Sequence, residues 1–314
     1  MSIAAYFSSL SLLKLLKNVP GGVAQGLIWG LMALGIYITF RLLDVADLTV
    51  DGSFTTGGAC TVMLILAGWP AWAALLVALI AGLLAGFCTG MLHTKLGIPA
   101  ILSGILTQFA LYSVNLHIMG MAANKAVSVD KFDLVLSSRN IPSAIITGLI
   151  IAAVLVALAY WYFGTEQGSA LRSTGDNAAM SRALGINIDN MKVLGLSLSN
   201  GVVALAGGLM AQYQGFADIN MGRGAIVIGL AAVIIGEVAF SKVFRNFGLK
   251  LLAVSFGAII YYIVIQAVLA MGLNPNYLKL LSAVVVAVFL SIPHWKNRYF
   301  HAKVPAKKGG ATHA

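Results

Sequence analysis

Four carboxylates within or beside apolar stretches are the residues of this sequence whose chemistry most needs an explanation. Asp44, Asp47 and Asp51 recur at intervals of three and four residues, so on a helix they would share one face, and Glu237 lies near the end of another apolar run. A charged group inside a bilayer is costly, and by default it marks a solute or ion pathway. Asp51 is the stronger candidate, because transporters often place solute contacts at a broken helix near the membrane centre.

A structural explanation of the same carboxylates stays open. The aspartates could cap a helix start or pair with Arg41, and Glu237 could extend towards Lys242 at the membrane surface. Neutral polar residues within the apolar stretches, each explicable as a hydrogen bond between helices, are Gln25, Gln108, Asn115, Asn200, Gln212 and Gln266. Together they favour a weakly polar passage over a proton relay. We expect its lining to include Asp47, Asp51, Phe54, Asn115, Asn200 and Glu237.

The motifs of an enzyme or of a metal site are missing from the sequence. It contains no G-x-x-x-x-G-K-[ST] phosphate loop, no H-E-x-x-H motif and no G-x-S-x-G elbow. Cys60 and Cys88 lie in apolar runs without Cys or His neighbours at ligand spacing. We therefore expect no catalytic residue, no metal and no cofactor in this chain. If the protein moves a solute uphill, the energy must come from an ion gradient or from ATP bound by a partner subunit.

Membrane helices must position these residues, because the composition excludes a water-soluble fold. Of the 314 residues, 60% are hydrophobic and 10% are charged, whereas a soluble domain has roughly a quarter of its residues charged. The mean hydropathy is +0.92. Backbone polar groups in lipid must be satisfied within their own helix, so long charge-free runs predict a helical bundle. Disorder, coiled coils and nucleic-acid binding are excluded, and the formal charge of +10 indicates basic cytoplasmic loops and tails.

Apolar runs near the length of about 20 residues that a bilayer requires predict an all-α polytopic transmembrane bundle of eight to ten spans. The full spans are expected at 21–40, 70–92, 100–119, 142–163, 191–213, 225–240, 249–271 and 278–292. The apolar run at 54–67 is too short to cross comfortably, so we expect a short or broken segment near residues 44–67. The domain order is then an interfacial segment at 1–20, a transmembrane domain at 21–292 and a basic cytoplasmic tail at 293–314.

Two of these spans carry small residues on one helical face. The stripes are Gly22, Gly26 and Gly30 in the first span and Gly82, Gly86 and Gly90 in the second. Such faces let helices approach closely. Packing within the bundle is the favoured interpretation, and a contact between two copies is the alternative.

The distribution of basic residues predicts the orientation. With a re-entrant segment at 54–67 and both termini inside, 14 of the 20 Lys and Arg residues lie on the cytoplasmic side. If that segment crosses instead, the N-terminus moves outside and the division becomes 13 to 7. The first topology is favoured and the second stays open.

The polar stretch at 164–190 has more helix punctuation than a connecting loop needs. It predicts a short helix broken at Gly175 and a second helix up to Leu184, with Asp176 as N-cap and Gly185 as the stop. A charged helix pair that projects from a bundle is suited to docking in a groove of another protein. The alternative is a solvated loop between spans.

Three stretches together resemble one family of membrane proteins. Residues 172–187, RSTGDNAAMSRALGIN, look like the cytoplasmic coupling segment of ABC-transporter permeases of the branched-chain amino acid and ribose type. Residues 205–215 and 224–237 are similar to the later spans of that family. Residues 43–54, LDVADLTVDGSF, resemble more narrowly the permease branch that accompanies tryptophan- or tyrosine-type binding proteins. The resemblance runs from about Gly21 to Ile292, but Glu237 stands where many relatives have glycine.

This resemblance implies a homodimeric, multi-pass permease subunit of an ATP-driven importer in a bacterial cytoplasmic (inner) membrane. Cytoplasmic ABC ATPase subunits would dock on the loop at 164–190, and an extracytoplasmic substrate-binding protein would deliver the solute. The branch favours amino acids as the solute, aromatic ones first. The family's ATPase-coupling role would fall on Arg172, Gly175, Asp176, Asn177, Arg182, Leu184 and Gly185.

Two functions of other classes stay open. An ion-coupled secondary transporter would use Asp51 or Glu237 and would lose transport when either carboxylate is neutralised. A membrane scaffold would bind a cytoplasmic protein through the loop at 164–190 and would carry no solute.

Overall fold

The computed structural model describes residues 12–129, 131–240 and 246–270, with residues 277, 280, 282–288 and 291. The expected span at 278–292 is described only in part, and the expected tail at 293–314 lies outside the described residues. Of the expected interfacial segment, residues 12–20 are described, and they form the first turns of a long helix.

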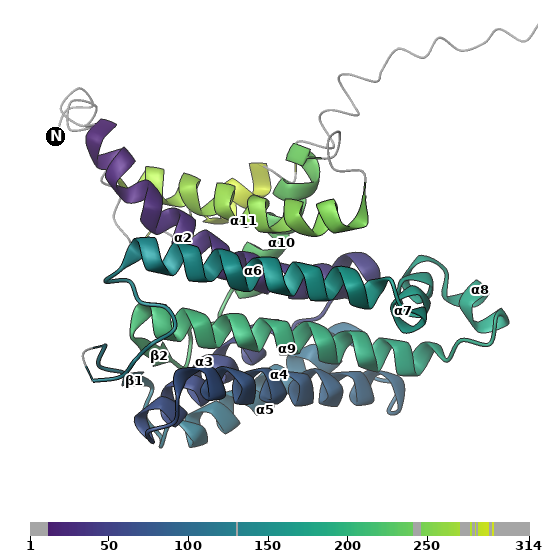
Figure 1. Cartoon of the computed structure of the whole chain (residues 1–314). Coiled ribbons are helices and arrows are strands. Elements are labelled where there is room, and N and C mark those ends of the chain that lie inside the picture. The colour runs from purple at the N-terminus through teal and green to yellow at the C-terminus, as the bar shows by residue number, and fades with distance from the viewer. Residues whose placement is uncertain are drawn as a thin grey trace, which may run out of the picture.

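The described chain is a bundle of long helices with one very small sheet (Figure 1). The helices are α2 (Leu12–Tyr37) with the π-helical turn η1 (Ile38–Leu42), α3 (Val50–Leu66), α4 (Ala71–Thr94), α5 (Ala100–Ile118), α6 (Ile141–Phe163), α7 (Glu166–Asp176), α8 (Ala178–Ala183), α9 (Ile188–Gln214), α10 (Ala225–Phe240) and α11 (Phe247–Ala270). The strands β1 (Asn124–Ala126) and β2 (Phe216–Asp218) pair antiparallel.

Six of the described helices are long and apolar enough to cross a membrane: α2 with η1, α4, α5, α6, α9 and α11. Two apolar helices are shorter, since α3 has 17 residues and α10 has 16. The all-α membrane bundle is therefore confirmed, whereas a count of eight to ten spans is not.

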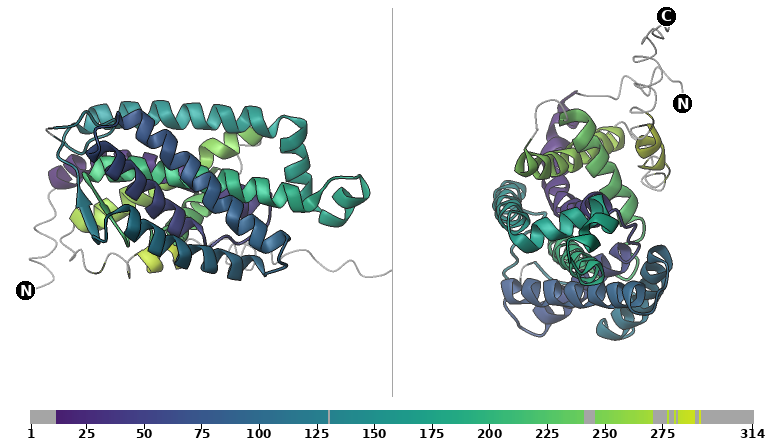
Figure 2. Two further views of the ribbon diagram at one scale, coloured as in Figure 1. Left: turned by 90° about the horizontal axis from the view of Figure 1, so that it is seen from below. Right: turned by 90° about the vertical axis from the view of Figure 1, so that its right-hand side faces the viewer.

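The helices of the bundle run in two opposite directions (Figures 1 and 2). The helices α7 and α8 lie at one end, called the α8 end below, and the two strands lie at the other, called the β end. The helices α2, α4, α6 and α10 run towards the α8 end, and α3, α5, α9 and α11 run towards the β end.

The expected short or broken segment near residues 44–67 is present, with its break at 43–49 before the continuous helix α3, but it does not turn back. Irregular residues 43–49 lead from η1 at the α8 end into the bundle, and α3 then runs alongside α9 in the same direction to the β end. The re-entrant topology is therefore wrong for this structure, and the crossing alternative holds. The short apolar run gains length because the polar residues before Phe54 are satisfied inside the bundle, which gives a helix roughly 25 Å long at 1.5 Å per residue.

Both glycine stripes pack within the chain. Gly22, Gly26 and Gly30 of α2 face α11, and a Cβ on Gly26 would lie 2.7 Å from the Cα of Ile259. The stripe of Gly82, Gly86 and Gly90 on α4 faces α9 in the same way. This close packing of α2 and α4 against their neighbours confirms the favoured interpretation and fixes the positions of the helices around the site.

Candidate solute pocket and coupling helices

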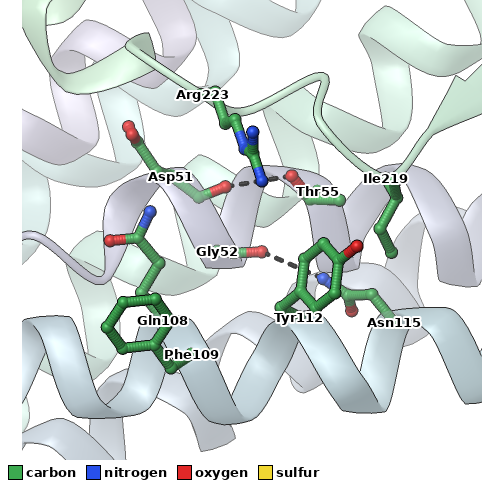
Figure 3. Close-up of a pocket in the computed structure, with 9 residues that line it drawn as sticks. All are labelled: Asp51, Gly52, Thr55, Gln108, Phe109, Tyr112, Asn115, Ile219 and Arg223. Atoms are coloured by element: carbon green, nitrogen blue, oxygen red, sulfur yellow. Dashed lines mark hydrogen bonds between the residues drawn. The ribbon is translucent and has the colours of Figure 1, made fainter.

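A pocket of about 450 Å³ opens between α3, α5 and the loop that joins β2 to α10 (Figure 3). Its lining residues are Asp51, Gly52, Thr55, Gln108, Phe109, Tyr112, Asn115, Ile219 and Arg223. This volume falls within the usual range of small-molecule sites, roughly 300–1,000 Å³. The lining is amphipathic, with one cation, one carboxylate, two amides and two aromatic rings.

Asp51, in the first turn of α3, caps the beginning of α10. Its carboxylate accepts hydrogen bonds from the backbone N–H of Gly224 at 2.9 Å and of Ile226 at 3.0 Å. The first N–H groups of a helix lack partners within the helix, and a carboxylate near them is stabilising. Asp51 therefore lies at the pocket and also joins α3 to α10.

Asp47 lies beneath the pocket in a buried hydrogen-bond network. One carboxylate oxygen accepts from the backbone N–H of Thr49 at 2.9 Å, and the other accepts from Nδ2 of Asn200 at 2.6 Å. The Oδ1 of Asn200 in turn accepts from the hydroxyl of Ser53 at 2.7 Å. Because all of these side chains are buried, they attach the irregular segment 43–49 to both α3 and α9.

Threonine hydroxyls extend the network to two more helices. The Oγ1 atoms of Thr49 and Thr89 are 2.7 Å apart, and Thr89 donates to Thr107 at 2.9 Å. Thr89 belongs to α4 and Thr107 to α5. Five parts of the chain are thus tied together by buried polar groups, which are costly to bury unless they are paired.

The six expected lining residues do not share one surface. Asp51 and Asn115 line the pocket, whereas Asp47 and Asn200 are buried in the network below it. The expectation that Phe54 lines the passage is wrong for this pocket. Phe54 is fully buried, and its ring stacks on Trp29 with the centroids 5.0 Å apart. Phe54 therefore belongs to the core of the bundle and does not line the pocket.

Glu237 was also expected to line the passage, but it lies far from the pocket along the bundle. Its carboxylate pairs with Arg41 at 2.9 Å, at the α8 end where η1 meets the end of α10. The expected partner Lys242 lies outside the described residues. This surface pair joins two elements and contributes modestly to stability.

Seven of the nine lining residues were not among those expected: Gly52, Thr55, Gln108, Phe109, Tyr112, Ile219 and Arg223. Gln108, Tyr112 and Asn115 share a face of α5 by helical spacing, so the sequence could have predicted that side of the pocket. No sequence pattern predicts the place of Arg223, because this residue reaches α3 only through the return of the chain after β2. No group of three or more His, Cys, Asp or Glu that could hold a metal occurs among the described residues.

The helices α7 and α8 form the punctuated segment that the sequence predicted, with shifted boundaries. Thr165 caps α7, which continues through Gly175 to Asp176. The break falls at Asn177, whose side chain accepts from the N–H of Met180 at 3.0 Å and caps α8. Asn177 rather than Asp176 is therefore the N-cap, and Gly185 follows α8 with a left-handed φ of +83°.

The seven expected coupling residues divide into a packed group and a projecting group. In α7, Gly175 lies directly against the carbonyl of Leu42 in η1, and the guanidinium of Arg172 lies 4.7 Å from the ring centre of Phe247. The others are exposed: Asp176 and Asn177 where α7 meets α8, and Arg182, Leu184 and Gly185 in and after α8. The first group attaches the segment to the bundle, and the second leaves a surface free for contact.

Comparison with known proteins decides the family. A model described as branched-chain amino acid transport system / permease component matches residues 18–290. The chain belongs to this permease family. It is thus a multi-pass membrane protein and the permease component of an ABC-type importer.

Individual relatives agree with the family over most of the chain. The tyrosine transport system permease protein of Clostridioides difficile is 39% identical over 276 residues, which cover 88% of this chain and 91% of that protein. Uncharacterized protein RP368 of Rickettsia prowazekii is 36% identical over 271 residues, covering 85% and 94%. The autoinducer 2 import system permease protein LsrC of Yersinia pseudotuberculosis is 30% identical over 210 residues, covering 67% and 59%.

Proposed function

We propose that this permease passes an amino acid, with aromatic amino acids favoured, across a bacterial cytoplasmic (inner) membrane as part of an ATP-driven importer. The observation that carries the choice of solute is the 39% identity to a tyrosine transport system permease over 91% of that protein. An extracytoplasmic binding protein delivers the solute at the β end. Cytoplasmic ATPase subunits bind ATP and act on the α8 end, and the permease itself needs no cofactor.

The exposed tip of α8 is the proposed docking element for the ATPase. Leu184 is 67% exposed and Met180 is 61% exposed, beside the exposed cation of Arg182. Apolar anchors rimmed by charge are typical of protein contacts. Because α8 is only six residues long and rests on α7, a force on its tip passes directly to α7.

A chain of packed groups then leads from α7 to the pocket. Gly175 contacts η1, the segment 43–49 follows, and Asp47 and Ser53 bind Asn200 on either side of the turn into α3. Asp51, at the start of α3, holds the beginning of α10. We propose that nucleotide and binding protein favour different positions of this chain of contacts, since a ligand shifts an equilibrium only by its differential affinity for the two states.

Support for a homodimer comes from the unequal exposed faces of α5 and α6. Between residues 144 and 159, the exposed residues of α6 are all Ile, Leu, Val or Ala, as expected for a helix in contact with lipid. The exposed face of α5 instead includes Tyr112, Ser113 and His117. Polar groups that face hydrocarbon are costly, so we propose that α5 faces a second copy and the solute passage.

Co-purification with the ATPase tests this function. The tagged permease is isolated in detergent from its native membrane, and the proteins that accompany it are identified by mass spectrometry. We expect a P-loop ATPase to accompany the wild type and to be lost from the double variant Arg182→Glu, Leu184→Asp. These changes leave the buried residues of α7, which are Gly168, Leu171 and Thr174, untouched.

A matched control is Lys95→Glu, which reverses an exposed cation in the turn between α4 and α5 at the same end. We expect this variant to retain the ATPase. Wild-type protein that carries no ATPase would contradict the proposal and favour an ion-coupled carrier. Equal recovery with both variants would remove α8 from the coupling.

A further inference from the structure

Arg223 is a cation of the pocket whose side chain makes no hydrogen bond or ion pair with any residue that the structure describes. It belongs to the loop before α10, is exposed, and extends over the first turn of α3 between Asp51 and Thr55 (Figure 3). Arg223 and Asp51 form no ion pair in the described part of the chain, although both residues line the pocket.

Two helix beginnings add positive potential at the same place. The helices α3 and α10 start at Val50 and Ala225, one residue before Asp51 and two residues after Arg223. Each helix beginning carries roughly half a positive charge from its unpaired N–H groups. One carboxylate, Asp51, faces these two beginnings and one guanidinium, so the local charge favours an additional anion.

The other side of the pocket provides an acceptor and aromatic rings. Asn115 is 1% exposed, and its Oδ1 has no hydrogen-bond partner among the described residues. Its Nδ2 makes only a long contact of 3.5 Å with the carbonyl of Gly52. A buried amide oxygen left unpaired is costly and can accept a hydrogen bond from a ligand. The ring of Tyr112 lies beside it, and the ring of Phe109 lies farther along α5, near Gln108 (Figure 3).

We propose that this pocket binds the transported solute by its carboxylate, which pairs with the guanidinium of Arg223. This inference rests on the proposed function. A guanidinium can hold a carboxylate through two parallel hydrogen bonds. The ammonium group of the amino acid then donates to Oδ1 of Asn115, and its aromatic ring packs against Tyr112. Arg223 is thus a specificity-determining residue that separates amino acids from neutral sugars.

The test measures binding of small solutes to the purified complex of permease and ATPase without the binding protein, by saturation-transfer NMR. The solutes are tyrosine, desamino-tyrosine, which keeps the carboxylate, tyramine, which lacks it, and ribose as a neutral solute. We expect tyrosine and desamino-tyrosine to bind in the wild type and tyramine to bind about tenfold more weakly or worse, as expected for one lost charge-assisted contact.

The variants Arg223→Gln and Arg223→Lys separate charge from structure. We expect Arg223→Gln to lose about tenfold or more in affinity for both carboxylates, with no change for tyramine, and Arg223→Lys to recover part of the loss. Lys131→Gln is the matched control, because Lys131 is an exposed cation at the β end outside this pocket. We expect it to bind tyrosine as the wild type does. ATPase stimulation is measured in every variant and shows that each complex is folded and assembled.

Equal binding of tyrosine and tyramine by the wild type would overturn the inference, as would an assembled Arg223→Gln complex that keeps wild-type affinity for tyrosine. If the complete importer carries tyrosine while Arg223→Gln has no effect, the pocket assignment alone fails. If ribose binds and tyrosine does not, the result contradicts both the proposed solute and this inference.

Discussion

At the scale of single residues, the hydrogen bond between Asn200 and Asp47 holds a buried carboxylate at the break before α3. Replacing Asn200 with leucine removes this donor and leaves the carboxylate of Asp47 with Thr49 as its remaining hydrogen-bond partner. A lost hydrogen bond to a charged group costs roughly 1.5–3 kcal/mol, so we expect Asn200→Leu to lower the free energy of unfolding by about that amount. Thermal unfolding in detergent measures the effect.

The matched control and a second variant separate this bond from general damage to α9. Asn190 lies on the same helix and is exposed, so Asn190→Leu should leave stability nearly unchanged. Adding Asp47→Ala to Asn200→Leu removes the stranded carboxylate, and we expect the double variant to lose less stability than the sum of the single variants. Strict additivity would show that the two side chains do not interact.

Asp51 separates an importer driven by ATP from an ion-coupled carrier. Because Asp51 caps α10, we expect Asp51→Ala to lower the free energy of unfolding by about 1 kcal/mol. Asp51→Asn keeps an oxygen that can accept a hydrogen bond from one of the two N–H groups. We expect Asp51→Asn to retain most of its solute uptake in proteoliposomes that contain the complete importer. An ion-coupled carrier requires the titratable carboxylate, so loss of uptake in a folded Asp51→Asn protein would favour that mechanism.

At the scale of elements, the contact between α7 and η1 is the step of the proposed route from ATPase to pocket at which the two backbones come closest to each other. A Cβ on Gly175 would overlap the carbonyl oxygen of Leu42, so even alanine must push α7 away from η1. We expect Gly175→Ala to lower stability by roughly 1–3 kcal/mol and to reduce stimulation of the partner ATPase more than membrane insertion. The control is Gln167→Ala, an exposed position on α7. ATPase stimulation that stays at the wild-type level with Gly175→Ala would exclude this contact from the coupling.

The helices that were predicted well are those whose sequence alone determines their ends. The spans expected at 70–92, 100–119 and 142–163 begin within one residue of α4, α5 and α6, because continuous apolarity follows a proline that starts each helix. The direction of α3 was predicted wrongly because its first residues are polar. They can be buried only through partners distant in the chain, such as Asn200 and Thr89.

The pocket shows the same limit of sequence-based prediction. Asp51 and Asn115 were found because polar residues are rare in apolar helices, and they line the pocket. Phe54 was expected to line the passage with Asp51 because both belong to the broken segment, but its ring is buried against Trp29. Arg223 carries no local signal, since it approaches α3 only through the packing of β2 and the loop that follows it.

At the scale of the whole molecule, the polar face of α5 should lie between two copies of the chain. We expect Ser113→Cys, in a background with Cys60→Ala and Cys88→Ala, to form a disulfide-linked dimer when membranes are treated with a mild oxidant. The matched control is Ala153→Cys on α6, an exposed position on a purely aliphatic face, which should stay monomeric on a non-reducing gel. A cross-link through α6 in place of α5 would assign the dimer contact to the other face.

The topology of the whole chain follows from the direction of α3. Because α3 crosses the bundle, α2 begins at the β end, opposite α8, and the basic residues Lys95, Arg172, Arg182 and Lys192 gather at the α8 end as the positive-inside rule requires of the cytoplasmic side. In the same cysteine-free background, we expect Asn18→Cys and Lys125→Cys to react with an impermeant maleimide in intact cells. Ala183→Cys should react only in inverted vesicles. Labelling of Asn18→Cys and Ala183→Cys from the same side would restore the re-entrant topology for residues 54–67, because only a segment that turns back lets α2 begin at the α8 end.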